Sequence, residues 1–277
     1  MKTILSIQSQ VAGAPVGNGA AAFAMARLGV RVLQLPTTLY GRRPDRGAPG
    51  GRVSEAALLS DLLAALNADG QLARVDAVLS GYLAAEEQIA FVVEAVDAVK
   101  AANKAALYMC DPVMGDEPKG LFVSEGVAEG MVQTLAPLAD WLAPNLWELG
   151  RIAGRPCADM AAARAAARRL GKPTLISSVP TPSGLGVLYC APGGDWLAET
   201  PLLPSAPKGT GDLLTALFLA RRIKGEAAPV ALEAATGAVH DVIVQSLALG
   251  VDDLALETAQ DLLVEPRTWP RAQALEV

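Results

Sequence analysis

The chain has 277 residues, 52% hydrophobic and 19% charged, which excludes a disordered chain and predicts a well-packed globular fold. Its 29 acidic and 23 basic residues give a net charge of −6, so no basic surface for nucleic acid is expected. No apolar stretch approaches the roughly 20 residues that a membrane-spanning helix needs. The opening residues MKTILSIQSQ lack a signal-peptide core, and we expect a cytoplasmic protein.

Short β-branched or leucine-rich segments alternate with longer helical patterns, as in repeated βα units around a mostly parallel sheet. The expected strands lie at 3–9, 31–36, 75–80, 106–110, 139–143, 173–178 and 186–190. The expected helices lie near 18–28, 55–67, 86–102, 124–135, 158–170, 211–223 and 227–248. This order predicts a doubly wound α/β fold, finished by an antiparallel hairpin of 186–190 and 195–199. Nothing resembles an interdomain linker, so one domain over residues 1–277 is expected.

The segment YGRRPDRGAPGGRV, residues 40–53, is rich in glycine, proline and arginine. That composition predicts a mobile loop over one sheet edge, where loops of open α/β sheets lie near ligands. Arg42, Arg43 and Arg46 are expected to keep this loop soluble, and contact with an acidic substrate is the alternative.

Two residue types with frequent catalytic roles are scarce. Cys110, Cys157 and Cys190 are widely spaced and form no CxxC pair, so neither a disulfide framework nor a zinc site is indicated. His240 is the single histidine, which excludes a multi-histidine metal site and leaves a Ser-His-Asp triad only if His240 itself serves. We expect His240 to pack on a helix or to face solvent.

The most informative motif is KGTGD, directly before the apolar helix. A helix N-terminus presents unpaired N–H groups and a partial positive charge, which favour an anion. Gly209, Thr210 and Gly211 leave the backbone accessible and add a hydroxyl, so the amides here can stabilise a phosphoryl group during transfer. Asp212 can accept the proton of a substrate hydroxyl as its oxygen attacks phosphorus. The alternative is that Asp212 only caps its helix.

Polar side chains follow two further predicted strands. Asp111 and Asp116 in CDPVMGDEPKG suit a hydrated Mg²⁺ ion that bridges phosphates, and the alternative is a solvated turn. Asn145 and Glu148 in APNLWELG are three residues apart, so both can reach the same metal-bound waters or phosphate oxygens. The alternative is that Asn145 caps a helix.

Gly17, Gly19 and Ala22 fit the loose dinucleotide pattern GxGxxA, which would predict an oxidoreductase. That pattern also needs an acidic residue about 20 positions further on. The chain offers none before Asp45, and the glycines lie well beyond the first strand. Dinucleotide binding is therefore set aside, as is a P-loop ATPase, because GxxxxGK[ST] does not occur.

Six segments together resemble, in order and spacing, the pyridoxal kinases of the ribokinase superfamily: SIQSQ, VGNGAAAFAMARLGV, AVLSGYL, CDPVMGD, APNLWELG and KGTGDLLTALFLA. The resemblance extends along almost the whole chain. It implies a ribokinase-like α/β/α sandwich that usually dimerises. It also implies transfer of the ATP γ-phosphate to the 5′-hydroxymethyl group of pyridoxal, pyridoxine or pyridoxamine, with Mg²⁺ and, as in many members, a monovalent ion such as K⁺.

The resemblance also implies roles for individual residues. Asp212 would be the base, with Gly209, Thr210 and Gly211 as the anion hole. The nucleotide contacts would be Asp111, Asn145, Glu148, Ser177, Lys208 and Gly211, of which Asp111 and Glu148 would lie at the metal. Ser9 would bond the pyridine ring, Tyr82 would border it and Tyr40 would replace the family's aromatic residue, while GDEPKG would be a flap over ATP.

Two segments depart from the family pattern. TLYGRRP stands where the family has a segment similar to Val-Gln-Phe-Ser-Asn-His-Thr, and Gln10 stands where a histidine is expected after Ser9. Both departures concern the vitamer, whereas the phosphoryl-transfer motifs are intact. One alternative is therefore a kinase for another hydroxymethyl compound, such as hydroxymethylpyrimidine or a nucleoside. The other is a non-catalytic vitamer-binding relative, against which the intact Asp212 and its glycines argue.

Overall fold

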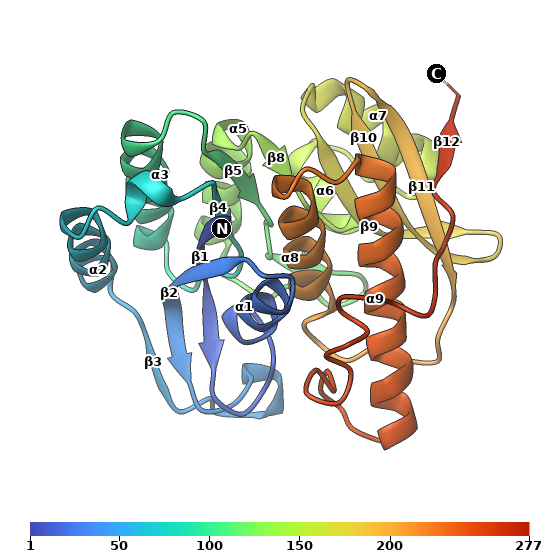
Figure 1. Ribbon diagram of the computed structural model, residues 1–277, viewed down its shortest axis with the longest axis horizontal. Coiled ribbons are helices and arrows are strands. Elements are labelled where there is room, and N and C mark those ends of the chain that lie inside the picture. Colours follow the sequence, from blue (N-terminus) through green and yellow to red (C-terminus); the bar gives the residue numbers. More distant parts are fainter. Residues whose placement is uncertain (277) are drawn as a thin grey trace.

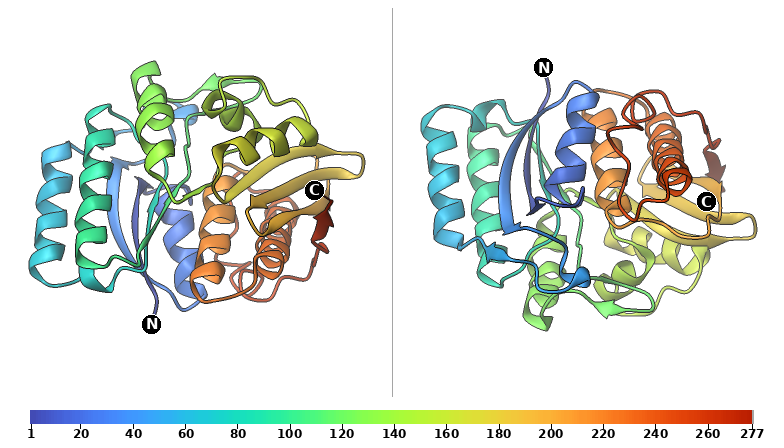
Figure 2. Two further views of the ribbon diagram at one scale, coloured as in Figure 1. Left: turned by 90° about the horizontal axis from the view of Figure 1, so that it is seen from above. Right: turned by 90° about the horizontal axis from the view of Figure 1, so that it is seen from below.

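The computed structural model describes residues 1–276, and one large sheet with helices on both faces forms its centre (Figures 1 and 2). In spatial order the strands are β12 (Gln273–Leu275), β11 (Gly194–Pro201), β10 (Gly184–Ala191), β9 (Thr174–Thr181), β8 (Trp141–Leu142), β5 (Leu107–Cys110), β4 (Ala77–Ser80), β1 (Thr3–Val11), β2 (Arg31–Tyr40) and β3 (Gly51–Val53). The strands from β9 to β2 are parallel, and those beyond them at both edges are antiparallel. A separate hairpin pairs β6 (Gly115–Asp116) with β7 (Gly120–Leu121).

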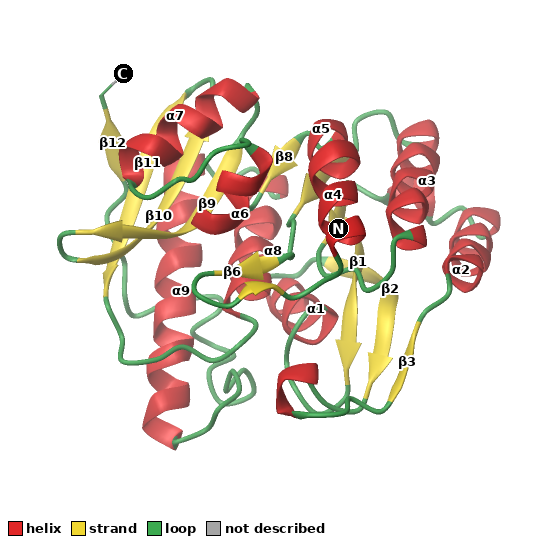
Figure 3. Ribbon diagram, turned by 180° about the vertical axis from the view of Figure 1, so that it is seen from behind, coloured by secondary structure: helices red, strands yellow, loops and turns green. Residues whose placement is uncertain are grey.

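The helices form one layer on each face of the sheet. The layer nearer the viewer in Figure 1 contains α1 (Asn18–Arg27), α8 (Thr210–Ile223) and α9 (Ala228–Leu249). The opposite layer, seen in Figure 3, contains α2 (Ala56–Ala68), α3 (Glu87–Ala102), α4 (Glu125–Gly130), α5 (Ala136–Leu138), α6 (Leu146–Ile152) and α7 (Met160–Leu170). Short 3-10 helices span Pro44–Arg46 and Leu72–Arg74. The predicted α/β/α sandwich is confirmed, and no helix within residues 1–276 is long and apolar enough to cross a membrane.

The alternation of side chains along β1 explains why both faces of the sheet are covered. Successive residues of a strand point to opposite faces. Ile4 accordingly packs in the core cluster of α1, α8 and α9, and Leu5 packs in the cluster of α2 and α3. The small side chains of Ala20 and Ala24 are completely buried, so α1 lies close to the sheet and to α8. The apolar central strands therefore need a helical layer on each side.

Some predicted elements differ from the structure near the first sheet edge. β2 continues to Tyr40, and β3 pairs with it inside the segment predicted as a loop. An edge strand leaves unpaired N–H and C=O groups, which β3 satisfies despite its glycine-rich sequence. The rest of the predicted loop contains the 3-10 helix Pro44–Arg46.

Other differences lie in the second half of the chain. The predicted strand 139–143 is shorter in the structure and consists only of β8. Just before it, the Asp140 N–H donates to the carbonyl of Tyr108 at 2.9 Å, and the Asp140 carboxylate accepts the N–H of Tyr108 at 2.7 Å. The predicted helix 124–135 is α4 followed by a π-helical turn, Met131–Leu135. α6 was expected only in the alternative in which Asn145 caps a helix. β12 was not predicted, and it pairs with β11 so that the hairpin does not finish the sheet.

The carboxyl ends of the parallel strands place the candidate site residues along one crevice. Ser9 lies near the end of β1, Tyr82 follows β4, and Asp111 directly follows β5. Asn145 follows β8 and lies opposite Ser177 of β9 in a parallel bridge. In open α/β sheets this edge is where ligands bind.

The segment after α9 crosses that helix at Gly237. Asp241 of α9 accepts hydrogen bonds from the N–H of Thr268 at 3.0 Å and from its hydroxyl at 2.6 Å, which hold the segment in place. A Cβ atom at Gly237 would overlap the carbonyl oxygen of Thr268. Only glycine allows this close approach.

Gly237→Ala is therefore expected to lower the free energy of unfolding by about 1–3 kcal/mol, because overpacking outweighs the gain in helix propensity. Urea denaturation measures the change. The control is Gly193→Ala, where no atom lies within 4 Å of the added methyl group. The control should change stability by less than about 0.5 kcal/mol, and equal stability of Gly237→Ala and wild type would contradict the close approach.

Candidate active site

One cleft of about 640 Å³ opens at the carboxyl ends of the parallel strands. Every residue predicted for the site lines it: Ser9, Tyr40, Tyr82, Asp111, Asn145, Glu148, Ser177, Lys208, Gly209, Thr210, Gly211 and Asp212. A second cleft of about 340 Å³ adjoins it and shares Ser177, Thr210 and Gly211 with it. The fold thus brings together residues that are up to two hundred positions apart in sequence.

The N-terminus of α8 forms one wall of the cleft. Gly209 precedes the helix with a φ of 95°, and a Cβ atom there would lie 2.7 Å from the carbonyl oxygen of Pro15, so both backbone and space require glycine. The first hydrogen bond at this helix end runs from the N–H of Leu213 to the carbonyl of Gly209, at 2.9 Å. The N–H groups of Thr210, Gly211 and Asp212 precede it and have no partner within the helix. They provide a positive site for an anion.

Asp212 stands in the first turn of α8, and its carboxylate points away from its own helix. Oδ2 accepts a hydrogen bond of 2.8 Å from the N–H of Gly17, and the helix has no side-chain cap. The interpretation of Asp212 as only a helix cap is therefore wrong. Burial raises the pKa of Asp212 to about 6, although the bond from Gly17 acts in the opposite direction. The carboxylate is thus a stronger base than an exposed aspartate.

Gly17 is a site residue whose role the sequence did not reveal. It precedes α1 with a φ of 54°, and a Cβ atom there would overlap Ser9. The GxGxxA pattern includes this glycine, but that pattern would assign it to dinucleotide binding. Its actual contact is with Asp212, across 195 positions of the chain, which no local pattern can show.

Asp111 lies between β5 and α8 and is only 5% exposed, so the solvated-turn alternative is wrong for this residue. Its Oδ2 accepts a hydrogen bond of 2.8 Å from the hydroxyl of Thr215. Burial raises the pKa of Asp111 well above its usual value, and the charges of Glu148 and Asp212 raise it further. Thr215 was not predicted, although its position three residues after Asp212 places both on one side of the helix.

Asn145 and Glu148 form a capping box at the start of α6. Asn145 Oδ1 accepts the N–H of Glu148 at 2.8 Å, and Glu148 Oε2 accepts the N–H of Asn145 at 2.9 Å. Glu148 Oε1 also accepts the N–H of Met114 at 3.0 Å. Burial raises the pKa of Glu148 to about 7, even though these backbone bonds lower it. The capping interpretation is therefore correct, and the same two side chains line the cleft.

Asp111 and Glu148 offer the oxygen ligands that Mg²⁺ prefers. Burial raises the pKa of both carboxyl groups because it disfavours their charged forms, and a cation beside them would stabilise those charged forms. Within residues 1–276 no group of three or more acidic, histidine or cysteine side chains could hold a metal ion. The donors fit a Mg²⁺ ion that takes its other ligands from phosphate and water.

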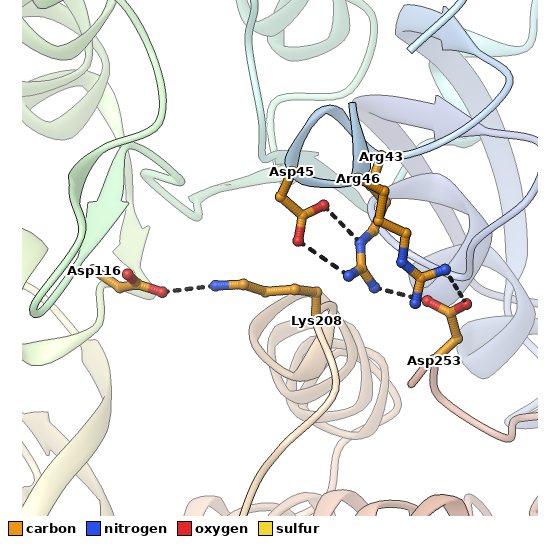
Figure 4. Close-up of polar contacts among 6 residues, drawn as sticks. All are labelled: Arg43, Asp45, Arg46, Asp116, Lys208 and Asp253. Atoms are coloured by element: carbon orange, nitrogen blue, oxygen red, sulfur yellow. Dashed lines mark hydrogen bonds and ion pairs between the residues drawn. The ribbon is translucent and has the colours of Figure 1, made fainter. Parts of the chain in front are cut away.

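Lys208 spans the cleft. Its Nζ lies 2.8 Å from Asp116 Oδ2 in β6 and 4.9 Å from the centre of the Phe122 ring, as Figure 4 shows for the ion pair. The other oxygen of Asp116 is buried and has no hydrogen-bond partner among the described residues. These contacts connect the β6–β7 hairpin, which is the predicted flap, to the segment just before the N-terminus of α8.

Tyr40 and Tyr82 line the cleft together with three further residues of the 40–53 segment, Arg43, Pro44 and Asp45. Burial raises the pKa of Tyr82, so its ring is an uncharged wall. Arg43 is only 9% exposed and is paired with Asp45 and Asp253. The expectation that Arg43 keeps the loop soluble is therefore wrong.

Comparisons with known proteins agree with this geometry. Residues 47–256 match the family model described as phosphomethylpyrimidine kinase. Pyridoxal kinase PdxY of Paraburkholderia phymatum is 38% identical over 97% of both chains, and that of Pseudomonas fluorescens is 36% identical over 99% of this chain and 98% of the relative. This chain belongs to the pyridoxal kinase family. The family resemblance and the kinase class inferred from the motifs are confirmed.

A solved pyridoxal kinase has the same fold. The enzyme from Leishmania donovani, in complex with ADP and pyridoxamine, superposes with a TM-score of 0.92 at 25% identity and covers 100% of both chains. The pyridoxal kinase from Entamoeba histolytica is similar in fold, with a TM-score of 0.91 at 19% identity. The whole chain, including the altered 40–53 segment, is thus accommodated by the family fold.

Glu148→Ala is expected to destabilise the protein by about 2 kcal/mol, because it removes a helix cap and leaves buried N–H groups unpaired. Thermal and urea unfolding of the ligand-free protein measure this effect. Glu129→Ala on α4 is the control, since Glu129 is exposed, and should change stability by less than about 0.5 kcal/mol. A Glu148 variant as stable as the control would show that the capping box does not stabilise the site.

Proposed function

We propose that this chain is a pyridoxal kinase, which transfers the γ-phosphate of ATP to the 5′-hydroxymethyl group of a vitamin B6 vitamer. The observation that carries this proposal is the position of the Asp212 carboxylate beside the free N–H groups at the start of α8, within the main cleft. One place in the cleft thus offers a base for an alcohol and a positive site for a phosphoryl group. The full-length similarity to pyridoxal kinases supports this choice of reaction.

In the proposed reaction the substrate hydroxyl lies against Asp212. Its oxygen attacks the γ-phosphorus, its proton passes to the Asp212 carboxylate, and the bond from that phosphorus to the bridging oxygen of ADP breaks. The N–H groups of Thr210 and Gly211 stabilise the charge on the phosphoryl oxygens. The pKa of about 6 leaves Asp212 largely ionised at neutral pH, yet basic enough to accept the proton.

The nucleotide would extend from α8 into the second cleft, which offers apolar side chains for the base: Leu185, Val187, Leu202, Val239 and Ile243. Ser177, Asn145 and Lys208 would contact its phosphates. Asp111 and Glu148 would hold Mg²⁺, which neutralises phosphate charge when bound. A monovalent ion such as K⁺ near Asp111 is part of the same proposal.

The vitamer would lie between Ser9, Tyr40 and Tyr82. Tyr40 and Tyr82 offer aromatic surfaces to the pyridine ring, and the Ser9 hydroxyl offers a hydrogen bond. The family resemblance also supports a cytoplasmic homodimer, which light scattering would detect as a mass of about twice 28.6 kDa.

A second candidate is phosphorylation of hydroxymethylpyrimidine. It is favoured by the family model, described as phosphomethylpyrimidine kinase, that matches residues 47–256. Both candidates use the same phosphoryl-transfer residues and differ only in the ring that binds beside Tyr40 and Tyr82.

An ADP-release assay with pyridoxal, pyridoxine, pyridoxamine, hydroxymethylpyrimidine and nucleosides separates the candidates. We expect kcat/KM for at least one B6 vitamer to exceed that for hydroxymethylpyrimidine by about tenfold or more. The reverse order would make the pyrimidine the substrate. Ligand-induced melting shifts without any ADP release would instead indicate a non-catalytic binding protein.

Asp212→Asn is expected to lower kcat by about 100-fold or more, because the amide cannot accept the proton. ATP affinity, measured by calorimetry, should change little, since the helix N-terminus is intact. Unchanged turnover would remove Asp212 from the mechanism.

The raised pKa of Asp212 also predicts a pH profile. Below pH 6 the carboxyl becomes protonated, so kcat/KM should fall by about tenfold per pH unit there and level off above pH 7. Stopped assays between pH 4.5 and 8 measure the profile. A midpoint near 4 would contradict a desolvated Asp212.

A further inference from the structure

The 40–53 segment beside the vitamer end of the cleft is bound to a distant part of the chain. α9 ends at Leu249 and is followed by Gly250 in the left-handed conformation, with a φ of 64°. The next residues, 251–256, are here called the brace. They have no regular secondary structure, yet Leu254 and Leu256 are each only 2% exposed, so the brace is anchored in the core.

Asp253 of the brace binds two arginines of the 40–53 segment with its two carboxylate oxygens. Oδ1 lies 2.7 Å from Arg43 Nη1, and Oδ2 lies 2.9 Å from Arg46 Nη1, as Figure 4 shows. Arg43 also donates from Nε and Nη2 to the two oxygens of Asp45, at 3.0 and 3.1 Å. The guanidinium of Arg43 is thus bound by two carboxylates, that of Asp45 in its own segment and that of Asp253 in the brace.

Of the two arginines in this cluster, Arg43 is the one that faces the site. Its side chain is 10% exposed, against 35% for Arg46, and both Arg43 and Asp45 line the main cleft. Geometrically fixed arginine–carboxylate contacts hold more strongly than flexible exposed ion pairs. Arg43 and Asp45, here called the vitamer wall, therefore take their position in the cleft from these contacts.

The residue after Asp253 contacts the phosphate end of the site. A Cβ atom at Gly209 would lie 3.1 Å from Cδ1 of Leu254, so Leu254 packs directly on the turn before α8. Two consecutive brace residues therefore touch the vitamer wall and the anion site. The brace fixes the distance between the two halves of the cleft.

We propose that Asp253 is a positioning residue for the reaction: through Arg43 it holds the wall against which the vitamer ring binds. The inference rests on the proposed function for the identity of the ligand. Asp253 lines neither cleft, so its loss should loosen vitamer binding and leave the phosphoryl-transfer residues in place. A variant of Asp253 should raise the KM for the vitamer and leave kcat and the KM for ATP nearly unchanged.

The test compares Asp253→Asn with Asp252→Asn, which makes the same change of charge at the exposed neighbouring residue. We expect Asp253→Asn to raise the KM for the best vitamer by about tenfold, or about 1.4 kcal/mol. The control should stay within about twofold in every constant. Asp253→Glu keeps the charge but displaces the carboxylate by one methylene, and should raise the KM by about threefold.

Limited trypsin digestion measures, without any substrate, how firmly the 40–53 segment is held in place. Arg42 and Arg46 offer cleavage sites in the segment, and we expect cleavage in Asp253→Asn to be about tenfold faster than in wild type and the control. Similar cleavage rates and similar vitamer KM values in the two asparagine variants would overturn the proposal. A wild-type protein inactive on every vitamer would refute the proposed function instead, and the trypsin comparison would still decide the role of Asp253.

Discussion

Three carboxylates, two buried and the third half-buried, meet at the carboxyl edge of the parallel sheet, and the rest of the site follows from how the fold tolerates them. Asp111, Glu148 and Asp212 each have a raised pKa, for which burial is the largest cause. A folded chain keeps such groups only where N–H and hydroxyl donors are supplied. Here the backbone of β6, the start of α1 and the α8 hydroxyl of Thr215 supply them. In the proposed function, these buried carboxylates are the groups that a polyphosphate and its cation would meet.

The structure also shows that capping and catalysis need not be alternatives. Asn145 and Glu148 complete a capping box, and the other carboxylate oxygen of Glu148 holds the loop before β6, so one side chain serves both the helix start and the cleft. Asp212 is the opposite case, because its helix has no side-chain cap and its carboxylate is held by the start of another helix. A polar residue at a helix start is therefore interpreted correctly only when the partner of its side chain is known.

The sequence allowed the fold class, the order of most elements and the set of candidate site residues to be predicted, because each motif directly follows an apolar strand or opens a helix. The site contacts that the sequence did not reveal join distant segments of the chain, and the missed elements have other causes. Gly17 with Asp212 and Arg43 with Asp253 are each separated by about two hundred positions. α6 has only 7 residues and β12 only 3, too few for a periodic pattern. β3 was not predicted because its segment is rich in glycine, which is typical of loops.

The ion pair between Lys208 and Asp116 has a consequence for ligand selection. Asp116 acts as an internal counterion, so any anion that reaches Lys208 competes with a carboxylate already 2.8 Å away. A single phosphate ion gains little by that exchange, whereas a nucleotide triphosphate also gains the N–H groups of α8 and hydrophobic contact for its base. In the proposed function this ion pair would therefore favour polyanions anchored at several points over small anions.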